Sequence, residues 1–462
     1  MTTFSSEITV PHPVADVFAW HERPGALVRL CPPWNSSVAE PPSDGLAVGS
    51  KATLRLDVPG TFGTVGVDWV AEHVALDPGA HFSDVMVSGP LRRWRHRHDF
   101  ASARDGEATT ITDSIDFNGP IPGLDAIQGP VIRRVLARNF AYRERQLSGD
   151  LAFHAAHAGP RRVIAVAGAS GMIGTQLCAL LSTGGHEVRR LVRRPATAAD
   201  EISWDPEAGA LDPDDLADVD VVVHLGGRTI GGRFTAANKR AMRNSRLDST
   251  KLLASVIAEL SGRGRDITFV CASAIGIYGA HRGDELLDEH ADGGDDFLAT
   301  LCRDWERATA PAADAGARVV NVRTGIVQSP NGGALGRQLP LFRLGLGGRL
   351  GDGKQWVSWI SIDDIVGVFA HVALTPGIHG PLNAVAPEPV RAATYASSLG
   401  SVLHRPAVLP VPAFAPALLL GREGAADVAL ASQRVGADAL ARSGYEFCQP
   451  TLAAALAHVL GH

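Results

Sequence analysis

Lysine is scarce in this sequence. Of its 43 basic residues only Lys51, Lys239, Lys251 and Lys354 are lysines, a bias that we attribute to codon usage rather than to function. The 49 acidic residues outnumber the basic ones. The resulting formal net charge of −6 argues against nucleic acid or an anionic membrane surface as a partner.

Cysteine is also sparse, and its spacing shows no pairs. The five cysteines are scattered and form no C-x-x-C motif, which argues against a disulfide framework or a zinc site and for reduced thiols in a cytoplasm. No apolar run approaches the roughly 18 residues that a membrane span requires. The N-terminus lacks the basic-then-apolar pattern of a signal peptide. We therefore expect a cytoplasmic protein without a membrane span.

The length of 462 residues exceeds what one hydrophobic core supports, so the chain should divide into two or three domains. Its 45% hydrophobic and 20% charged residues are typical of a globular protein. A stretch rich in small residues, proline and glycine separates two different patterns near residue 160. We predict a first domain at 1–155, a second at 162–380 and a smaller third at 381–462.

The strongest local pattern lies at 163–174, where a buried-strand pattern runs into a turn punctuated by glycines. Gly168 permits the tight turn, Gly171 lets the backbone approach a pyrophosphate, and Gly174 lets the next helix pack against the strand. A helix and a second strand follow, so this stretch predicts dinucleotide binding at the helix N-terminus. The residues expected to contact the cofactor here are Gly168, Ser170, Gly171, Met172, Ile173 and Gly174.

The end of the second strand, predicted at 187–192, indicates which dinucleotide fits. An NAD site places Asp or Glu there for the ribose 2′-hydroxyl, whereas an NADP site places arginine for the 2′-phosphate. The sequence has Arg193 and Arg194, and Asp200 lies too far along, so NADP is favoured with NAD as the alternative. Two later buried strands should also end beside the cofactor. Their expected contact residues are Leu225, Gly226, Gly227 and Cys271.

The alternation of strands and helices after residue 162 predicts an α/β fold with a doubly wound parallel sheet. The chain carries these motifs from there to the C-terminus: Gly168-x-x-Gly171-x-x-Gly174, Ile202-Ser203-Trp204-Asp205-Pro206, Ser273-Ala274-Ile275-Gly276-Ile277-Tyr278-Gly279, Trp305-Glu306, Arg323-Thr324-Gly325, Gln355-Trp356-Val357-Ser358-Trp359 and His404-Arg405-Pro406. They resemble the extended short-chain dehydrogenase/reductases, in particular the epimerase-like subfamily of the NAD-dependent epimerase/dehydratase group that ends in a domain of unknown function. The resemblance implies an NAD(P)-dependent oxidoreductase or epimerase acting on a small molecule.

The same resemblance implies where the substrate lies. In the family, a glycine-rich region corresponding to 345–353 and the segment after it close over the substrate, and a small C-terminal domain completes the cleft. Helices of that domain are expected at 392–403, 435–441 and 451–460. The candidate pocket residues are Arg323, Gln355, Ser358 and Trp359.

The catalytic pattern of the superfamily is missing. The family uses a Tyr-x-x-x-Lys pair, in which the lysine lowers the tyrosine pKa, and a Ser or Thr that polarises the substrate oxygen. Leu298, Cys302 and Ala274 stand at the tyrosine, lysine and serine positions. Ser273 and Tyr278 are the remaining candidates for proton donation; alternatively Ser273 holds cofactor or backbone and Tyr278 is a packed ring. An enzyme and a non-catalytic NADP(H) sensor or hydrophobic-ligand carrier both stay open.

Residues 1–155 follow a different pattern. One strand, a short helix and a run of strands punctuated by Gly, Pro or Asp precede a helical stretch at about 124–149. This α+β order resembles the START-like helix-grip domains of the polyketide cyclase and lipid-transport superfamily. The resemblance implies a hydrophobic-ligand pocket between the sheet and the long helix.

Two histidines in this first domain have a spacing that a metal site could use. His96 and His98 lie two residues apart in an expected strand and so share a face. No acidic or cysteine partner is evident nearby in the sequence, and metal ligands normally come in sets of three or four. We therefore expect no metal, and place both histidines on a wet face of the sheet.

Overall fold

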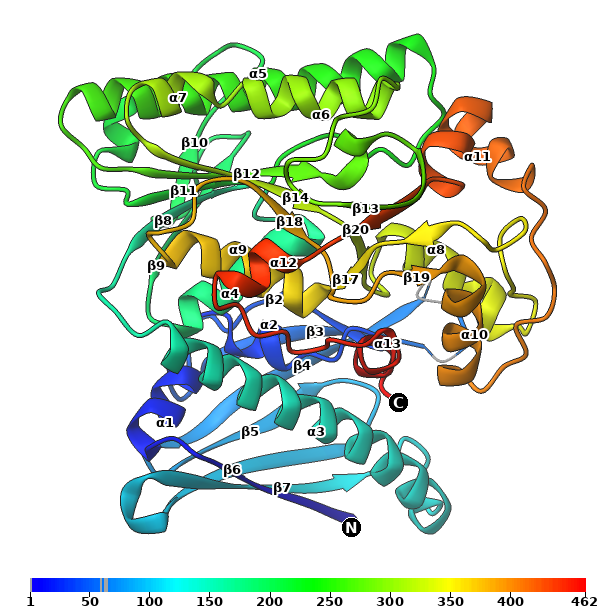
Figure 1. The fold of residues 1–462 in the computed structure, drawn as a ribbon. Helices are drawn as coiled ribbons and strands as arrows, with labels where there is room; N and C mark the ends of the chain where they lie inside the picture. The colour runs from blue at the N-terminus through cyan, green and yellow to red at the C-terminus, as the bar shows by residue number, and fades with distance from the viewer. Residues whose placement is uncertain (1, 59, 62–64) are drawn as a thin grey trace. The chain divides into compact units, whose positions relative to one another are not determined.

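The computed structural model describes residues 2–58, 60–61 and 65–462. By its internal contacts the chain divides into two compact units (Figure 1). The first comprises the residues up to 158 together with 179–185 and 458–462, and the second comprises 159–178 and 186–457.

The first unit is built from a seven-stranded antiparallel sheet, in the order β1-β7-β6-β5-β4-β3-β2, and the long helix α3 (Asp125–Ala156), which lies along the sheet (Figure 1). Two short helices, α1 (Val14–Glu22) and α2 (Ala26–Leu30), follow the first strand. The predicted helix-grip arrangement is confirmed, although the sequence predicts neither α2 nor β2. The strands are β1 (Thr2–Val10), β2 (Ser36–Glu40), β3 (Lys51–Asp57), β4 (Gly66–Asp77), β5 (His81–Ser88), β6 (Arg93–Ala103) and β7 (Ala108–Asn118).

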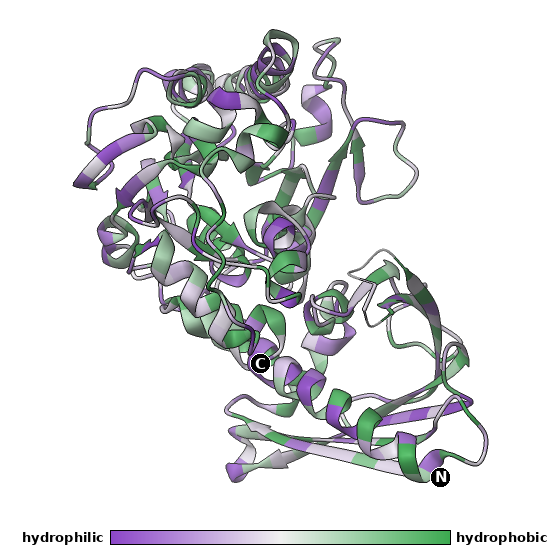
Figure 2. Cartoon of the chain, turned by 90° about the vertical axis from the view of Figure 1, so that its right-hand side faces the viewer, coloured by the Kyte–Doolittle hydropathy of each residue, from purple (hydrophilic) through white to green (hydrophobic). Residues whose placement is uncertain are grey.

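Residue alternation along β7 determines which face of this sheet is covered. Ile115 and Phe117 point to the same side and are fully buried, because side chains two residues apart in a strand share a face. They pack with Leu136 and Phe140 of α3. Figure 2 shows both hydrophilic and hydrophobic residues along α3, and its buried side chains include Leu136, Phe140, Leu147 and Leu151. Each such buried side chain contributes about 1.5–3 kcal/mol, which holds the helix on the sheet.

The placement of His96 and His98 on a wet face is wrong. Their side chains are only 5% and 12% exposed, and the His96 ring lies 5.7 Å from the Phe140 ring of α3. Strand pairing also brings Asp84 of β5 and Asp113 of β7 beside them. These acidic neighbours are distant in the sequence, so only the register of the sheet reveals them.

The second unit contains a seven-stranded sheet whose pairings are all parallel, in the order β10-β9-β8-β11-β12-β14-β18. Helices α5, α6 and α7 cover one face and α4 and α9 the other (Figure 1), so the predicted doubly wound α/β fold is confirmed. The strands are β8 (Val163–Ala167), β9 (Glu187–Val192), β10 (Glu201–Ser203), β11 (Val221–His224), β12 (Thr268–Ala274), β14 (Arg318–Thr324) and β18 (Gly380–Ala384). The helices are α4 (Met172–Thr183), α5 (Ala236–Gly262), α6 (Phe297–Arg307), α7 (Ala310–Asp314) and α9 (Ile362–Leu374).

Shorter elements complete this unit and the C-terminus. The segment 435–441 is predicted as a helix, but Val435 ends strand β20 and the helix begins only at Asp438, because β20 pairs with β13. The other two predicted C-terminal helices are present as α10 and α13. The elements are α8 (Gly333–Arg343), α10 (Ala392–Val402), α11 (Ala415–Gly424), α12 (Asp438–Arg442), α13 (Leu452–Leu460), β13 (His281–Leu287), β15 (Ile326–Gln328), β16 (Trp356–Val357), β17 (Trp359–Ser361), β19 (Val390–Arg391) and β20 (Ser432–Val435).

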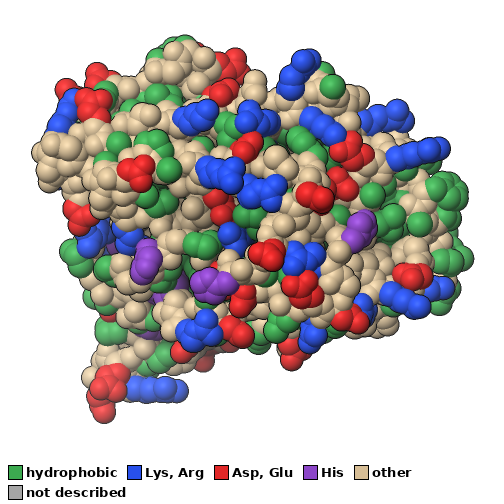
Figure 3. Space-filling view, turned by 45° about the horizontal axis from the view of Figure 1, so that its top comes forward, with side chains coloured by type: hydrophobic (Ala, Val, Ile, Leu, Met, Phe, Trp, Pro, Cys, Tyr) green, Lys and Arg blue, Asp and Glu red, His purple; other side chains and the backbone are tan. Residues whose placement is uncertain are grey.

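The surface carries charges of both signs. On the face shown in Figure 3, Lys and Arg side chains are interspersed with Asp and Glu rather than gathered into one basic area. Among the described residues, no helix has the length and hydropathy needed to cross a bilayer.

Candidate functional site

The glycine turn between β8 and α4 has the geometry of a phosphate-binding loop. Gly168 has a φ of +83°, a region that favours glycine. A side-chain carbon on Gly174 would overlap the carbonyl oxygen of Gly168, so only glycine lets the helix lie this close to the turn. Ser170 and Gly171 are exposed. Because α4 starts at Met172, the unpaired N–H groups of its first turn lie at this loop, where they can bind a pyrophosphate.

A second glycine turn, after β11, lies against the first. A side-chain carbon on Gly168 would be 3.0 Å from the Gly226 nitrogen and from the carbonyl carbon of Leu225, so the two turns touch through their backbones. The buried His224 supports this turn. Gly226 N–H donates to His224 Nδ1 (3.3 Å), which leaves His224 Nε2 as the donor to Ser249 Oγ (2.9 Å). Sequence reasoning missed His224, since a histidine inside a buried strand carries no distinctive signal.

The buried His224 should make the stability of the second unit depend on pH. Burial, reinforced by the charge of Arg246, lowers the pKa of His224 from 6.5 to about 3. Between these values the unfolded chain binds a proton that the folded chain does not, so the free energy of unfolding should fall as the pH drops below 6.5. The expected slope is up to ~1.4 kcal/mol per pH unit.

Denaturant unfolding measured between about pH 7 and about pH 4.5 checks this prediction. In the variant His224→Gln, the free energy of unfolding should depend less steeply on pH, by the contribution of one titrating proton. Ser249→Ala, which removes the hydrogen-bond partner but keeps the titrating ring, should lower stability at every pH and retain the slope. An identical slope in His224→Gln and the wild type would contradict the assignment.

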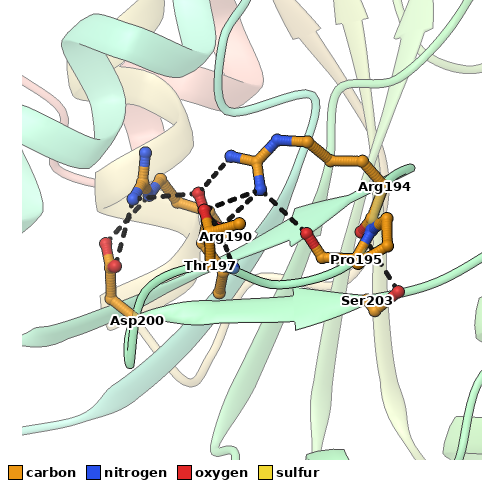
Figure 4. Close-up of polar contacts among 7 residues, drawn as sticks. Arg190, Arg194, Pro195, Thr197, Asp200 and Ser203 are labelled. Atoms are coloured by element: carbon orange, nitrogen blue, oxygen red, sulfur yellow. Dashed lines mark hydrogen bonds and ion pairs between the residues drawn. The ribbon is translucent and has the colours of Figure 1, made fainter.

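The two arginines after β9 have different surroundings. Arg194 donates to both carboxylate oxygens of Glu201, at 2.8 and 2.6 Å, and Arg190 pairs with Asp200 (Figure 4). Hydrogen bonds, first of all from Arg194, hold the pKa of Glu201 at about 2. The exposed Arg193 makes no hydrogen bond or ion pair within the described residues. Since β9 and β8 are parallel neighbours, Arg193 lies at the same edge of the sheet as the glycine turn and is available to an anionic ligand.

Two more arginines at this edge were not predicted. The exposed Arg228 follows the second glycine turn, and Arg337 of α8 lies over Gly231, where a side-chain carbon would overlap its guanidinium. The start of α8 is also close to the first turn, since a side-chain carbon on Gly332 would be 3.4 Å from the Met172 sulfur. Neither guanidinium has a hydrogen-bond or ion-pair partner in the part of the chain that the structure describes. A phosphate-rich ligand would therefore meet three unpaired positive charges.

Ser273 and Tyr278, the predicted proton donors, belong to one buried network. Ser273 Oγ donates to Glu306 Oε1 at 2.7 Å, and Arg323 donates to both oxygens of Glu306, at 2.9 and 3.0 Å. Arg323 also donates to the Tyr278 hydroxyl at 3.0 Å, and that hydroxyl donates to Asn383 at 2.7 Å. The network forms because Ser273 and Arg323 are register partners on β12 and β14.

Tyr278 is sealed in the interior, whereas Glu306 and Arg323 reach a cavity, so these residues can have different roles. Tyr278 is fully buried, and burial raises its pKa although Arg323 opposes the shift. With both hydroxyl partners inside the protein, it fits the packed-ring alternative better than proton donation. Glu306 and Arg323, in contrast, line a small cavity of about 260 Å³ together with Ile277 and Arg303. Ser273 is linked to this cavity through Glu306, a residue that the Trp305-Glu306 motif could have indicated.

The positions at which the family carries Tyr and Lys are apolar in this protein. Leu298 and Cys302 of α6 are 8% and 4% exposed. Burial raises the pKa of the Cys302 thiol to about 12, and the charge of Glu306 adds to the effect. A neutral thiol beside a leucine cannot act as an acid–base pair.

Four side chains predicted to contact ligands are packed or hydrogen-bonded within the protein. Cys271, expected at the cofactor, is fully buried in the core, where its pKa is raised. Ser358 and Trp359 are also buried, and both donate to backbone carbonyls, at 2.8 and 3.0 Å. Gln355 likewise donates to a backbone carbonyl, at 3.1 Å. Their roles at a ligand stay predictions, and Arg323 is the predicted pocket residue that lines the 260 Å³ cavity.

Three segments match known protein families. Residues 164–380 match the NAD dependent epimerase/dehydratase family. Residues 10–141 match the family described as polyketide cyclase / dehydrase and lipid transport, and residues 411–459 match a domain of unknown function, DUF1731. The second unit thus contains the epimerase match except for residues 179–185, and the first unit contains the lipid-transport match.

Individual proteins agree with these matches. The epimerase family protein Mb2239 of Mycobacterium bovis is 42% identical over 297 residues, which is 64% of this chain and 97% of that protein. A crystal structure described as the nucleoside-diphosphate sugar epimerase from Corynebacterium glutamicum has a TM-score of 0.79 and 37% identity, covering 99% of this chain and 90% of that one. The crystal structure of human epimerase family protein SDR39U1 (isoform 2) with NADPH has a TM-score of 0.58 and 33% identity, covering 64% of this chain and 99% of that one.

Proposed function

Because the chain belongs to the NAD-dependent epimerase/dehydratase family of NAD(P)-binding proteins, we propose that its own cofactor is NADP(H) and that it is an oxidoreductase. The reaction is hydride transfer to or from a carbonyl or hydroxyl carbon of an apolar small molecule. The unpaired Arg193 at the end of β9 carries the cofactor proposal, because it stands where an NADP site needs a cation for the 2′-phosphate. The NADPH in the related human structure supports it.

The residues present fit this cofactor. The close packing of Gly174 on Gly168 leaves the first turn of α4 open to a pyrophosphate, and the second turn at Gly226 lies directly beside it. The guanidiniums of Arg228 and Arg337 would offset the phosphate charge. NADP(H), when bound, supplies the hydride donor or acceptor. The protein's part is to bind and orient it and to provide a proton path.

For the proton path we propose Ser273 with Glu306. Ser273 is close to the end of β12, a strand whose C-terminal end faces the ligand cleft in this type of sheet. Its hydroxyl is hydrogen-bonded to Glu306, which in turn lines the 260 Å³ cavity with Arg323. Arg323 donates to both oxygens of Glu306 and fixes the orientation of this carboxylate, which is the proposed acceptor of the serine proton.

The first unit supports the proposal of an apolar substrate. Its match to polyketide cyclase and lipid-transport proteins supports a hydrophobic ligand there, and we propose that this ligand is the substrate or product of the second unit. The name of the Corynebacterium protein refers to nucleoside-diphosphate sugars instead. A substrate panel should therefore contain apolar aldehydes and ketones as well as nucleotide sugars.

Tyr278→Phe is expected to keep turnover and NADPH affinity and to lower the free energy of unfolding by about 1–3 kcal/mol, because Asn383 Oδ1 and one N–H of Arg323 lose their hydrogen bonds to the hydroxyl. Ser273→Ala should lower turnover by roughly 10²–10⁴-fold with NADPH affinity retained. NADPH oxidation with the substrate panel and thermal unfolding measure both effects. Loss of turnover in Tyr278→Phe without loss of stability would reverse the assignment.

A second function is favoured by one observation, the buried Leu298 and Cys302 in place of Tyr and Lys. A non-catalytic NADP(H) sensor or hydrophobic-ligand carrier needs no acid–base pair. Such a protein would bind NADPH tightly, but no compound of the substrate panel would cause NADPH oxidation. Turnover that depends on Ser273 excludes this alternative.

A further inference from the structure

A histidine–aspartate cluster in the sheet of the first unit has no part in the proposed reaction. Asp84 on β5 is the register partner of His96 on β6, and His98 on β6 is the register partner of Asp113 on β7. Directly paired residues, and residues two apart in one strand, share a face of the sheet. All four side chains therefore converge on the face that packs against α3, where Phe140 is beside His96.

Asp113 determines which ring nitrogens carry protons. Its Oδ1 is 2.9 Å from His96 Nε2 and 2.6 Å from His98 Nδ1. A carboxylate oxygen accepts hydrogen bonds, and both ring nitrogens lie within hydrogen-bonding distance of Asp113 Oδ1. Each singly protonated ring then donates its one N–H to Asp113.

The other nitrogen of each ring then carries an unshared lone pair. These two nitrogens, His96 Nδ1 and His98 Nε2, both face Asp84. His96 Nδ1 is 3.5 Å and His98 Nε2 is 3.9 Å from Asp84 Oδ2. One ligand atom from each of the three residues lies within 4.8 Å of the others. A cation between these three ligand atoms would interact favourably with all of them.

We propose that Asp84, His96 and His98 bind one divalent transition-metal ion of the Zn²⁺ or Fe²⁺ class. Two imidazole nitrogens and one carboxylate oxygen are a donor set that such ions take. Ligands about 2.1 Å from a tetrahedral ion lie roughly 3.4 Å apart, close to the 3.5 and 3.9 Å that separate Asp84 from the two rings. Asp113 is the outer carboxylate that orients metal-bound histidines.

The surroundings favour a defined site over a loose surface one. The Phe82 ring stacks on His98 with centroids 4.1 Å apart, and the side chains of Asp84 and Asp113 are 14% and 12% exposed. Both carboxylates are thus largely shielded from water, which strengthens their attraction for a cation. Three protein ligands leave at least one coordination position for a water or a ligand.

Metal titration of the untagged, full-length, chelator-stripped protein tests the proposal. The wild type should bind one equivalent of Co²⁺, with visible absorption bands that Zn²⁺ abolishes by displacement. Asp84→Asn and His98→Gln should each weaken binding by at least about 100-fold, and Asp113→Asn by about 10–100-fold. The matched control is His81→Gln, which removes a histidine 3.8 Å from Asp77 on the same sheet and should leave binding unchanged.

Thermal unfolding separates metal binding from a purely structural network. Zn²⁺ should raise the melting temperature of the wild type and of His81→Gln but not of Asp84→Asn, because a ligand stabilises only the state that binds it. Without metal, Asp84→Asn should melt no lower than the wild type, since its amide can donate to the lone pairs. Binding that survives Asp84→Asn, no stoichiometric binding at all, or an Asp84→Asn protein that fails to fold would each overturn the proposal.

Discussion

Arg193→Ala is expected to weaken NADPH binding by roughly 30- to 150-fold and to leave NADH binding within about twofold. The guanidinium makes no hydrogen bond or ion pair with the described residues, so its removal breaks no structural contact. What is lost is a pair of charge-assisted hydrogen bonds to the 2′-phosphate, worth about 2–3 kcal/mol. Fluorescence titrations with the two dinucleotides measure the effect.

Two further arginine variants make this test specific. Arg194 is already held by both oxygens of Glu201, so Arg194→Ala should reduce NADPH affinity much less than Arg193→Ala. Arg263 at the end of α5 pairs with Asp214 and Glu259, and Arg263→Ala removes the same charge away from the site. Equal losses for NADPH and NADH, or a loss no larger than in Arg263→Ala, would show that Arg193 does not recognise the 2′-phosphate.

Gly174→Ala is expected to destabilise the second unit by about 1–3 kcal/mol and to abolish dinucleotide binding. Its new methyl group would overlap the Gly168 carbonyl oxygen, so α4 must move away from the turn. Gly171→Ala is the matched variant, because its methyl group would be 3.3 Å from that oxygen at an exposed position. It should change stability by less than about 0.5 kcal/mol and still lose NADPH binding, since the methyl group occupies space that the pyrophosphate needs.

Thermal unfolding and NADPH titration on the same two proteins check this pair. Gly174→Ala should lose stability and NADPH binding together, whereas Gly171→Ala should lose NADPH binding alone. Wild-type affinity in Gly171→Ala would mean that the dinucleotide does not approach the turn.

The features that sequence reasoning predicted are those whose evidence is local. The glycine turn, its strand and the start of its helix lie within positions 163–174, and the predicted strand at 187–192 coincides with β9. Secondary-structure periodicity and glycine spacing act over this range. The parallel sheet then follows from the alternation of elements.

The features that were missed or misplaced depend on pairing between distant strands. Nothing near His96 and His98 in the sequence shows that Asp84 and Asp113 will face them, because only the sheet register brings the three strands together. Tyr278 was a reasonable proton donor by location, yet burial depends on how the rest of the unit packs around it. Burial and the pairing of distant strands are properties of the folded chain, and the local patterns of a single sequence do not predict them.

A crystal structure of the full-length protein with NADPH is the most direct test of the central claim, that the edge formed by β9, β8, β11 and β12 binds NADP(H). The account predicts the pyrophosphate on the turn between Gly168 and Gly174 and the 2′-phosphate within hydrogen-bonding distance of Arg193. A 2′-phosphate bound away from Arg193, or a dinucleotide bound outside this edge, for example in the open groove lined by Arg349, His404 and Arg405, would contradict it.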